Sequence, residues 1–479
     1  MESIDDTTTS NYRKIHEAYM QNLNGTTALE TYFLIVPSFL NIFICLSVIH
    51  IITPLVHLQI SKLSQFLIEF CVIVLPNLLW LTVLSDYIKY VFLSLLCIST
   101  CILIYFLQFI QHTDFSKIKF ENKHRHFITN ARSTINVLTA ICILAVDFQI
   151  FPRRFAKTET FGFGLMDVGV GLYVCSNGVV ASHTLKDHFN GFFNVLFKSF
   201  ISCTPLFILG SVRFVLTNEL DYQLHVSEYG VHWNFFITLA VTKMLSTIIL
   251  YLIPARYSLP TTIFLILLQE YLLQVGLQEW VLSDIKRSTF LTANREGIVS
   301  SLGYVAIYFL AIQVSNFMNL KETISFKDNV RLLYKLIIIS VITLILTFFC
   351  EKNFGVSRRL ANSGYIFWIL FIFVSMHAFF LVVELILMII FVSLKTYFEK
   401  NSIRIGKSTE LTSIILEAVN FNGLTFFLLA NVLTGLINLT IQTLKIDPFN
   451  SILILFIYSF IICAALSAVY VQNIKLKFW

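Results

Sequence analysis

The fold class is decided by long apolar runs, such as the one at residues 364–396, which reads GYIFWILFIFVSMHAFFLVVELILMIIFVSLKT. A helix needs about 20 mostly apolar residues to cross the hydrocarbon core of a bilayer. This run is longer, so it predicts either one strongly tilted helix or a bent pair of spans. The composition agrees, because 57% of the 479 residues are hydrophobic, 13% are charged and the mean hydropathy is +0.78. These values exclude a soluble globular protein and predict a polytopic membrane protein.

Thirteen such runs, bounded by charged residues, Pro or polar clusters, divide the chain. They predict an all-α fold, a single bundle of about thirteen transmembrane helices. The bundle occupies residues 31–473, between a luminal N-terminal tail at 1–30 and a cytosolic C-terminal tail at 474–479. The runs lie near 31–53, 66–84, 90–110, 133–151, 164–183, 191–215, 232–253, 259–277, 298–318, 331–350, 364–396, 420–440 and 450–473.

Three features orient the bundle. An odd number of spans places the termini on opposite faces, and the loops on the C-terminal face carry slightly more Lys and Arg, which favours a cytosolic location for that face. The sequence NGT at 24–26 is a glycosylation sequon, usable only in the lumen, so Asn24 is a predicted glycosylation site. The ending KLKFW at 475–479 has the lysine-x-lysine-x-x form of a cytosolic retrieval signal. We therefore expect a multi-pass protein of the endoplasmic-reticulum membrane with a luminal N-terminus and a cytosolic C-terminus.

Cysteine usage and net charge restrict the classes of site. The nine cysteines lie in or beside predicted spans and form no Cys-x-x-Cys pair, so they indicate packing residues rather than disulfides, and we expect no metal site. The net charge of +6 lies in loops beside the membrane, where Lys and Arg govern topology and contact lipid headgroups. Nucleic acid is not an expected partner.

The stretch 145–160, AVDFQIFPRRFAKTET, brings five charged residues to the end of the fourth run. Asp147 lies about one turn before Pro152, which places its carboxylate near the membrane interface. Lys157 follows the Pro-containing turn and could fold back toward Asp147. Acyl transfer to a hydroxyl needs a base for the hydroxyl proton and a donor for the oxyanion, so Asp147 and Lys157 are the candidate catalytic residues. The alternative interpretation is a helix-end Asp neutralised by local Arg.

Arginines on the same face predict a phosphate site. Arg153 with Arg154, Arg358 with Arg359, and Arg295 suit a charge-assisted grip on phosphate. An apolar bundle with such a rim favours a phospholipid headgroup, and the alternative is lipid contact without specificity. Polar residues in or at the lip of spans usually face a cavity or a partner, although asparagines also pack helices together. They complete the predicted substrate-binding set: Asp167, Asn177, Glu228, His232, Asn294, Glu296 and Asn422.

Other acyl-transfer signatures are missing, including a Gly-x-Ser-x-Gly elbow and a His-x-x-x-x-Asp motif. His377, alone in an apolar run, could be the membrane histidine of another acyltransferase class, but such a residue is more often a packing residue. Two alternatives come from other functional classes. A lipid transporter or scramblase would use the same charges to line a headgroup path without acyl chemistry, and a structural assembly subunit would not need Asp147 or Lys157.

Five motifs occur in order along the chain. They are AVDFQIFPRRFAKTET at 145–160, LMDVGVG at 165–171, EYGVHWNFF at 228–236, ANREGI at 293–298 with LGY at 302–304, and SRRLAN at 357–362. Together they closely resemble the glucosaminyl-phosphatidylinositol inositol acyltransferases, the PIG-W family, and in particular its fungal members. The resemblance covers nearly all of the chain after about residue 25. A departure from the family pattern is Gln149, where relatives have Pro, and it touches none of the charged positions.

The resemblance implies an acyl-CoA-dependent inositol O-acyltransferase of glycosylphosphatidylinositol (GPI) anchor biosynthesis. Such an enzyme moves a fatty acyl chain, typically palmitoyl, from acyl-CoA to the inositol of glucosaminyl-phosphatidylinositol on the luminal side. The Asp and Lys of the family motif match Asp147 and Lys157, and the acyl-donor pocket, the target of antifungal compounds in the family, would lie near Val170. We expect no cofactor besides acyl-CoA as co-substrate, membrane lipids as further partners, and a monomer.

Overall fold

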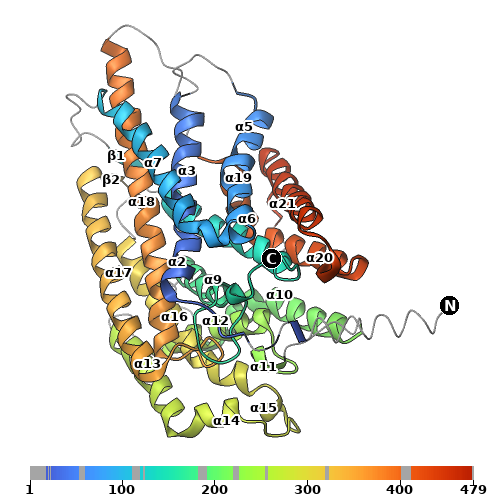
Figure 1. The fold of residues 1–479 in the computed structure, drawn as a ribbon. Helices are drawn as coiled ribbons and strands as arrows, with labels where there is room; N and C mark the ends of the chain where they lie inside the picture. The colour runs from blue at the N-terminus through green and yellow to red at the C-terminus, as the bar shows by residue number, and fades with distance from the viewer. Residues whose placement is uncertain are drawn as a thin grey trace, which may run out of the picture.

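The computed structural model describes residues 18–19, 21, 23–52, 60–109, 119–121, 125–181, 191–219, 226–253, 257–318, 323–400 and 412–476 (Figure 1). The first half contains α2 (Ala28–Ile35), α3 (Pro37–Ser47), η1 (Val48–Ile52), α5 (Lys62–Glu69), η2 (Phe70–Val74), α6 (Leu75–Leu81), η3 (Ser85–Tyr87), α7 (Ile88–Leu107), β1 (Lys119–Glu121), α8 (His126–Ala145), η5 (Arg153–Phe155), α9 (Leu165–Ala181), α10 (Phe192–Glu219) and α11 (Val226–Tyr229). The second half contains α12 (Phe235–Leu252), α13 (Ser258–Leu272), η7 (Leu273–Leu277), α14 (Gln278–Leu282), α15 (Phe290–Ala293), α16 (Arg295–Met318), β2 (Thr323–Ser325), α17 (Phe326–Phe354), α18 (Ser363–Lys400), α19 (Ile414–Phe421), α20 (Gly423–Thr440), η8 (Thr443–Lys445) and α21 (Pro448–Val471).

Twelve helical stretches of the described residues, several of them built from consecutive elements, are long and apolar enough to cross a membrane. Each matches one predicted span. The remaining prediction, 164–183, corresponds to α9, of which 17 residues, Leu165–Ala181, lie in the described part of the chain. The run 364–396 lies within one continuous helix, α18, rather than in a bent pair. The prediction of an all-α polytopic membrane protein is confirmed. Residues 1–17 and 477–479 of the two predicted tails lie outside the described residues.

The centre of the bundle is formed by α16 and α18, which bury most of their residues, whereas α7 and α17 bury few of theirs. The short helix α9 packs against both central helices. A Cβ atom at Gly178 would lie 2.7 Å from the Tyr308 carbonyl oxygen of α16, and one at Gly171 would lie 2.6 Å from the Ile369 side chain of α18. Glycine at these two positions therefore permits the close approach that fixes α9 in the core.

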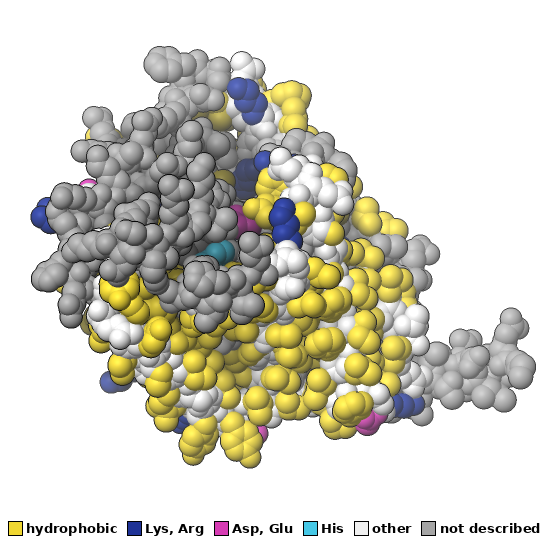
Figure 2. Space-filling model, turned by 90° about the horizontal axis from the view of Figure 1, so that it is seen from above, with side chains coloured by type: hydrophobic (Ala, Val, Ile, Leu, Met, Phe, Trp, Pro, Cys, Tyr) yellow, Lys and Arg dark blue, Asp and Glu magenta, His cyan; other side chains and the backbone are white. Residues whose placement is uncertain are grey.

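The outer surface is apolar, as a membrane environment requires. Seen from above in Figure 2, hydrophobic side chains cover much of the described surface, and charged side chains appear as a few isolated groups. On α17, residues such as Ile338, Ile345 and Phe349 are exposed. Because lipid tails are as apolar as these side chains, this exposure is compatible with a bilayer and not with water.

Two polar contacts join segments that lie far apart in the sequence. The buried Glu69 carboxylate at the end of α5 accepts hydrogen bonds from the backbone N–H groups of Ile414 (2.9 Å) and Ile415 (2.8 Å) and from the Ser413 hydroxyl (2.7 Å). It thereby satisfies donors at the start of α19 that have no partner within the helix. Strands β1 and β2 form a short antiparallel sheet with Phe120 opposite Ile324, a feature that the all-α prediction did not include.

The loops that carry most of the predicted site residues are connected to one another. The Gly162 N–H donates to the Val356 carbonyl at 2.9 Å, which joins the turn after α8 to the loop before α18. The Val231 N–H donates to the Ala293 carbonyl at 2.9 Å, which joins the loop after α11 to α15. In Figure 1, α11, α14 and α15 lie together at one end of the bundle. These contacts bring distant motifs together there.

Candidate active site

The turn after α8 is anchored by aromatic side chains. Phe148, Phe151 and Phe155 are all fully buried. Burying one such side chain stabilises a fold by about 1.5–3 kcal/mol relative to leaving it exposed. The three rings therefore fix the backbone from which the Asp147 and Lys157 side chains project.

The Asp147 carboxylate is held from two sides. Asp147 is 5% exposed and accepts a hydrogen bond from Asn438 Nδ2 of α20 at 2.7 Å. Arg153 donates to the Val146 carbonyl at 2.7 Å, and its positive charge interacts with Asp147. Burial lowers the pKa of Arg153, while the nearby Tyr19 and Asp147 act in the opposite direction. Asp147 is thus an oriented hydrogen-bond acceptor at the end of α8.

The Lys157 ammonium contacts a different partner from the one expected. Lys157 Nζ lies 2.8 Å from Glu228 Oε1 of α11, and its side chain is 39% exposed. The structure therefore corrects the expectation that Lys157 folds back toward Asp147. The physical reason is that the Glu228 side chain is only 18% exposed, and a carboxylate that is largely buried stays ionised only if cations lie beside it.

Glu228 belongs to a set of charged and polar residues that we call the Arg358 network. It consists of Lys157, Thr158, Asp167, Glu228 and Arg358. Arg358 Nε donates to Asp167 Oδ1 at 2.7 Å, and one Arg358 terminal nitrogen lies 3.5 Å from Glu228 Oε1. Asp167 Oδ2 also accepts hydrogen bonds from the Thr158 N–H (3.0 Å) and hydroxyl (2.9 Å). Two cations and two carboxylates balance in this network, and Arg358 joins them.

The network keeps Glu228 ionised. Burial raises the pKa of Glu228, but the charges of Lys157 and Arg358 outweigh it and lower that pKa to about 2. Burial lowers the pKa of Arg358, while Glu228 and Asp167 raise it well above its usual range. Because the folded-state pKa of Glu228 is depressed from 4.5, its contribution to stability is present above pH 4.5 and is lost as the pH falls toward 2.

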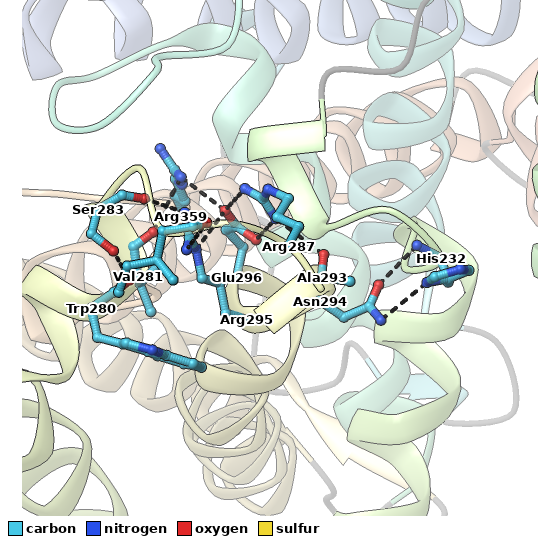
Figure 3. A network of polar contacts seen from close by, with 11 residues as sticks. His232, Trp280, Val281, Ser283, Arg287, Ala293, Asn294, Arg295, Glu296 and Arg359 are labelled. Carbon is cyan, nitrogen blue, oxygen red and sulfur yellow. Dashed lines mark hydrogen bonds and ion pairs between the residues drawn. The ribbon is translucent and has the colours of Figure 1, made fainter. Parts of the chain in front are cut away.

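Arg359 enters a second group of charges, the Glu296 cluster, which consists of Arg287, Arg295, Glu296 and Arg359 (Figure 3). The Glu296 side chain is 0% exposed and accepts hydrogen bonds from Arg287 at 2.5 and 3.0 Å and from Arg359 at 2.8 Å. Arg295 Nε lies 3.6 Å from the same carboxylate. Three guanidinium groups share one buried carboxylate here.

Asn294 binds the loop that follows Glu228. Its Oδ1 accepts the backbone N–H of His232 at 2.8 Å, and its Nδ2 lies 3.4 Å from Nδ1 of the His232 ring (Figure 3). Gly230 has a φ of +124°, and a Cβ there would lie 2.6 Å from the Asn294 Cα. The loop after Glu228 therefore packs tightly on the residue that precedes the Glu296 cluster.

Other predicted site residues lie apart from these groups. Arg154 pairs with Glu30 at 3.0 Å and with Asp86. Asn177 is exposed on α9, and Val170 is buried in the apolar core. The structure does not bring these side chains to the Arg358 network.

Asn422 anchors the C-terminal segment. It lies between α19 and α20, and its side chain accepts the Leu476 N–H at 2.8 Å and donates to the Ile474 carbonyl at 3.1 Å. Lys475 lies over the Phe421 ring, 5.7 Å from its centroid. This arrangement indicates a structural position for Asn422.

His377, considered as the histidine of a different acyltransferase class, is fully buried in α18. Its Nδ1 lies 2.7 Å from the Phe373 carbonyl oxygen of the same helix, and its ring packs against Phe127 and Phe373. These contacts are those of a packing residue.

Two residues of the site are not among the predicted site residues. Arg287 precedes Glu296 by nine positions, and its only signal is that it follows Lys286 in a short loop. Asn438 is one of several asparagines around α20, and its spacing does not distinguish it from the others. Their importance follows from contacts with Glu296 and Asp147.

Comparison with known proteins places the chain among named relatives. The family model GWT1 matches residues 12–469. A "Glucosaminyl-phosphatidylinositol-acyltransferase PIGW" of Bos taurus is 31% identical, with 98% of this chain and 99% of the relative covered. A "GPI-anchored wall transfer protein 1" of Schizosaccharomyces pombe is 35% identical over 94% of this chain and 96% of the relative. A "Phosphatidylinositol-glycan biosynthesis class W protein" of Dictyostelium discoideum is 28% identical over 98% and 99%.

Proposed function

Because the chain belongs to the GWT1 family, it is an acyltransferase of GPI-anchor biosynthesis, and we propose that it transfers a fatty acyl chain from acyl-CoA to an inositol hydroxyl of glucosaminyl-phosphatidylinositol. Palmitoyl-CoA is the proposed donor. The acceptor is the substrate in the printed name of the Bos taurus relative, which aligns over nearly the whole of both chains.

In the proposed reaction, Asp147 is the general base. The inositol hydroxyl attacks the thioester carbonyl, and its proton passes to the Asp147 carboxylate. The new C–O ester bond forms, the C–S bond breaks, and the thiolate of CoA takes up the proton. The Asn438 amide supports this role because it donates to one carboxylate oxygen, Oδ2, and so orients the carboxylate at the end of α8.

Lys157 is the proposed oxyanion donor. An ammonium group has three N–H donors, and the Glu228 contact uses one of them. The remaining donors, on a side chain that is partly exposed, are available to a thioester oxygen. The observation that carries the proposal is this pair of groups on one short turn, an oriented carboxylate and a tethered ammonium, at the end of a membrane helix.

An assay with purified full-length protein tests the reaction. Radiolabelled palmitoyl-CoA and glucosaminyl-phosphatidylinositol are expected to yield a labelled glycolipid whose label is released by mild alkali, as an ester requires. One equivalent of free CoA should appear for each ester formed. Movement of the glycolipid across a bilayer without consumption of palmitoyl-CoA would instead identify a lipid transporter.

The proposed orientation places this site in the lumen of the endoplasmic reticulum. Asn24 is exposed, and the Thr26 N–H beside it donates to the Phe163 carbonyl at 2.8 Å, so the sequon lies at the turn that carries Lys157. We expect endoglycosidase treatment of the wild-type protein to reduce its mass, and Asn24→Gln to abolish that shift. The control is His124→Thr, combined with Asn24→Gln, which completes a sequon at Asn122 in the loop after the third predicted span. Glycosylation of this control, with none at Asn24, would reverse the orientation.

A further inference from the structure

The arginines at this end of the bundle differ in how their charge is compensated. Arg153 interacts with the carboxylate of Asp147, Arg154 pairs with Glu30 and Asp86, and Arg358 is balanced within its network. In the Glu296 cluster, by contrast, three arginines share a single carboxylate. The charged groups that act on Arg295 are the other three members of the cluster. This cluster therefore carries an excess of two positive charges.

An excess of positive charge is energetically unfavourable where guanidinium groups are buried. Arg295 and Arg359 are 3% and 10% exposed, and the Nε atoms of both have no hydrogen-bond acceptor among the described residues. Buried guanidinium groups are normally paired and hydrogen-bonded, because removing them from water is unfavourable. An anion with several acceptor oxygens would satisfy both the charge and the free donors.

Arg287 is the most exposed member of the cluster. The Arg287 side chain is 22% exposed, although it donates to both oxygens of Glu296 and to the Ala293 carbonyl. Arg359 donates to Glu296 and to the Val281 carbonyl through the same nitrogen. In Figure 3 the guanidinium groups converge on Glu296 from different loops, so their positions are fixed before any ligand arrives. Such preorganisation lowers the cost of binding an anion.

The position of the cluster favours a lipid as the source of the anion. Val281 lies on α14, at the end of a membrane-crossing stretch, and Trp280 beside it is partly buried. Tryptophan is enriched at the level of the lipid headgroups, which is also the level of the phosphates. The site therefore faces the layer in which phosphodiester groups are most concentrated.

We propose that Arg287, Arg295 and Arg359 bind the phosphate group of a substrate, with a phosphatidylinositol headgroup as the ligand. The choice of lipid rests on the proposed function. Arg359 directly follows Arg358, which contacts Glu228, the partner of Lys157. The backbone at 358–359 therefore joins the proposed phosphate site to the network that contains Lys157.

Binding to purified full-length protein tests the site without turnover. The probes are dioctanoyl-phosphatidylinositol, dioctanoyl-phosphatidylcholine, coenzyme A and myo-inositol, and the measurement is the thermal unfolding midpoint at increasing probe concentration. We expect phosphatidylinositol to stabilise the wild-type protein, and Arg287→Gln to raise its half-saturating concentration about tenfold, because one charge-assisted fork is lost. The control is Arg331→Gln, whose side chain is 76% exposed on α17, with unchanged binding.

Each outcome has a defined meaning. Weakened binding of coenzyme A, rather than of phosphatidylinositol, in Arg287→Gln would support the phosphate site and assign it to the acyl donor. Equal binding of both phosphatidylinositol and coenzyme A by wild type and Arg287→Gln, or binding of phosphatidylcholine as tight as that of phosphatidylinositol, would overturn the proposal. If Arg287→Gln does not fold, Arg287→Lys keeps the charge without the planar fork, and unchanged binding in that variant also overturns it.

The proposed function and the phosphate site can fail separately. A wild-type protein that binds phosphatidylinositol through Arg287 but transfers no acyl group would refute the reaction and leave the site standing. A protein that transfers acyl groups while Arg287→Gln binds as wild type does would refute only the site.

Discussion

Replacing Asp147 with Asn is expected to reduce acyl transfer by about 10²- to 10⁴-fold, the usual contribution of a general base. Asparagine has the same shape and keeps an oxygen that can accept the Asn438 amide, so the contact with α20 survives. The amide cannot take up the inositol proton. The measurement is the initial rate of ester formation, compared at equal protein concentration with the thermal unfolding midpoint of each sample.

The matched control changes the partner instead of the carboxylate. Asn438→Ala keeps the base but removes its orienting hydrogen bond, so we expect a smaller loss than in Asp147→Asn. A folded Asp147→Asn protein with wild-type activity would show that the base lies elsewhere. Equal losses in the two variants, with a lowered unfolding midpoint in both, would indicate that Asp147 acts mainly by holding α20.

Replacing Lys157 with Ala is expected to reduce the rate by about 10²- to 10³-fold, as loss of one oxyanion donor does. The Lys157 side chain is 39% exposed, and its partner Glu228, although only 18% exposed, still has Arg358 to balance its charge, so we expect the protein to stay folded. Glu228 keeps its contact with Arg358 at 3.5 Å. A Lys157→Ala protein that retains the wild-type rate would remove Lys157 from the mechanism.

Glu228→Gln separates the role of the Lys157 ammonium from that of the carboxylate that holds it in place. This variant leaves the Lys157 ammonium in place but removes the carboxylate that holds it, so we expect a loss of about tenfold, smaller than that of Lys157→Ala. The measurement is the initial rate of ester formation at equal protein concentration, compared with that of Lys157→Ala and with the thermal unfolding midpoint of each sample.

Much of the helical architecture could be predicted from the sequence, because membrane helices are long and their apolar composition is a local signal. The run 364–396 illustrates the limit of this signal. The length of this run is compatible with one helix or with two. The structure has one helix, α18, which packs along α17 and α16, and no local sequence pattern encodes that packing.

The partners of the charged residues could not be predicted in the same way. Lys157 and Glu228 are 71 positions apart, and nothing near either residue identifies the other. Arg358 and Arg359 were predicted as a pair of phosphate-binding residues, and the structure places them in different groups of charges. The reason is local: they lie in an irregular loop that continues to Ala361, with a φ of +45°, so consecutive side chains leave the backbone in different directions.

The attachment of the C-terminal segment to Asn422 has a practical consequence for work on this protein. Residues 474 and 476 are bonded to Asn422 at the start of α20, and α20 carries Asn438, which orients Asp147. A helix transmits displacement along its axis because its internal hydrogen bonds make it stiff. A purification tag or fluorescent fusion appended to the C-terminus is therefore mechanically connected, through α20, to the carboxylate that we propose as the base.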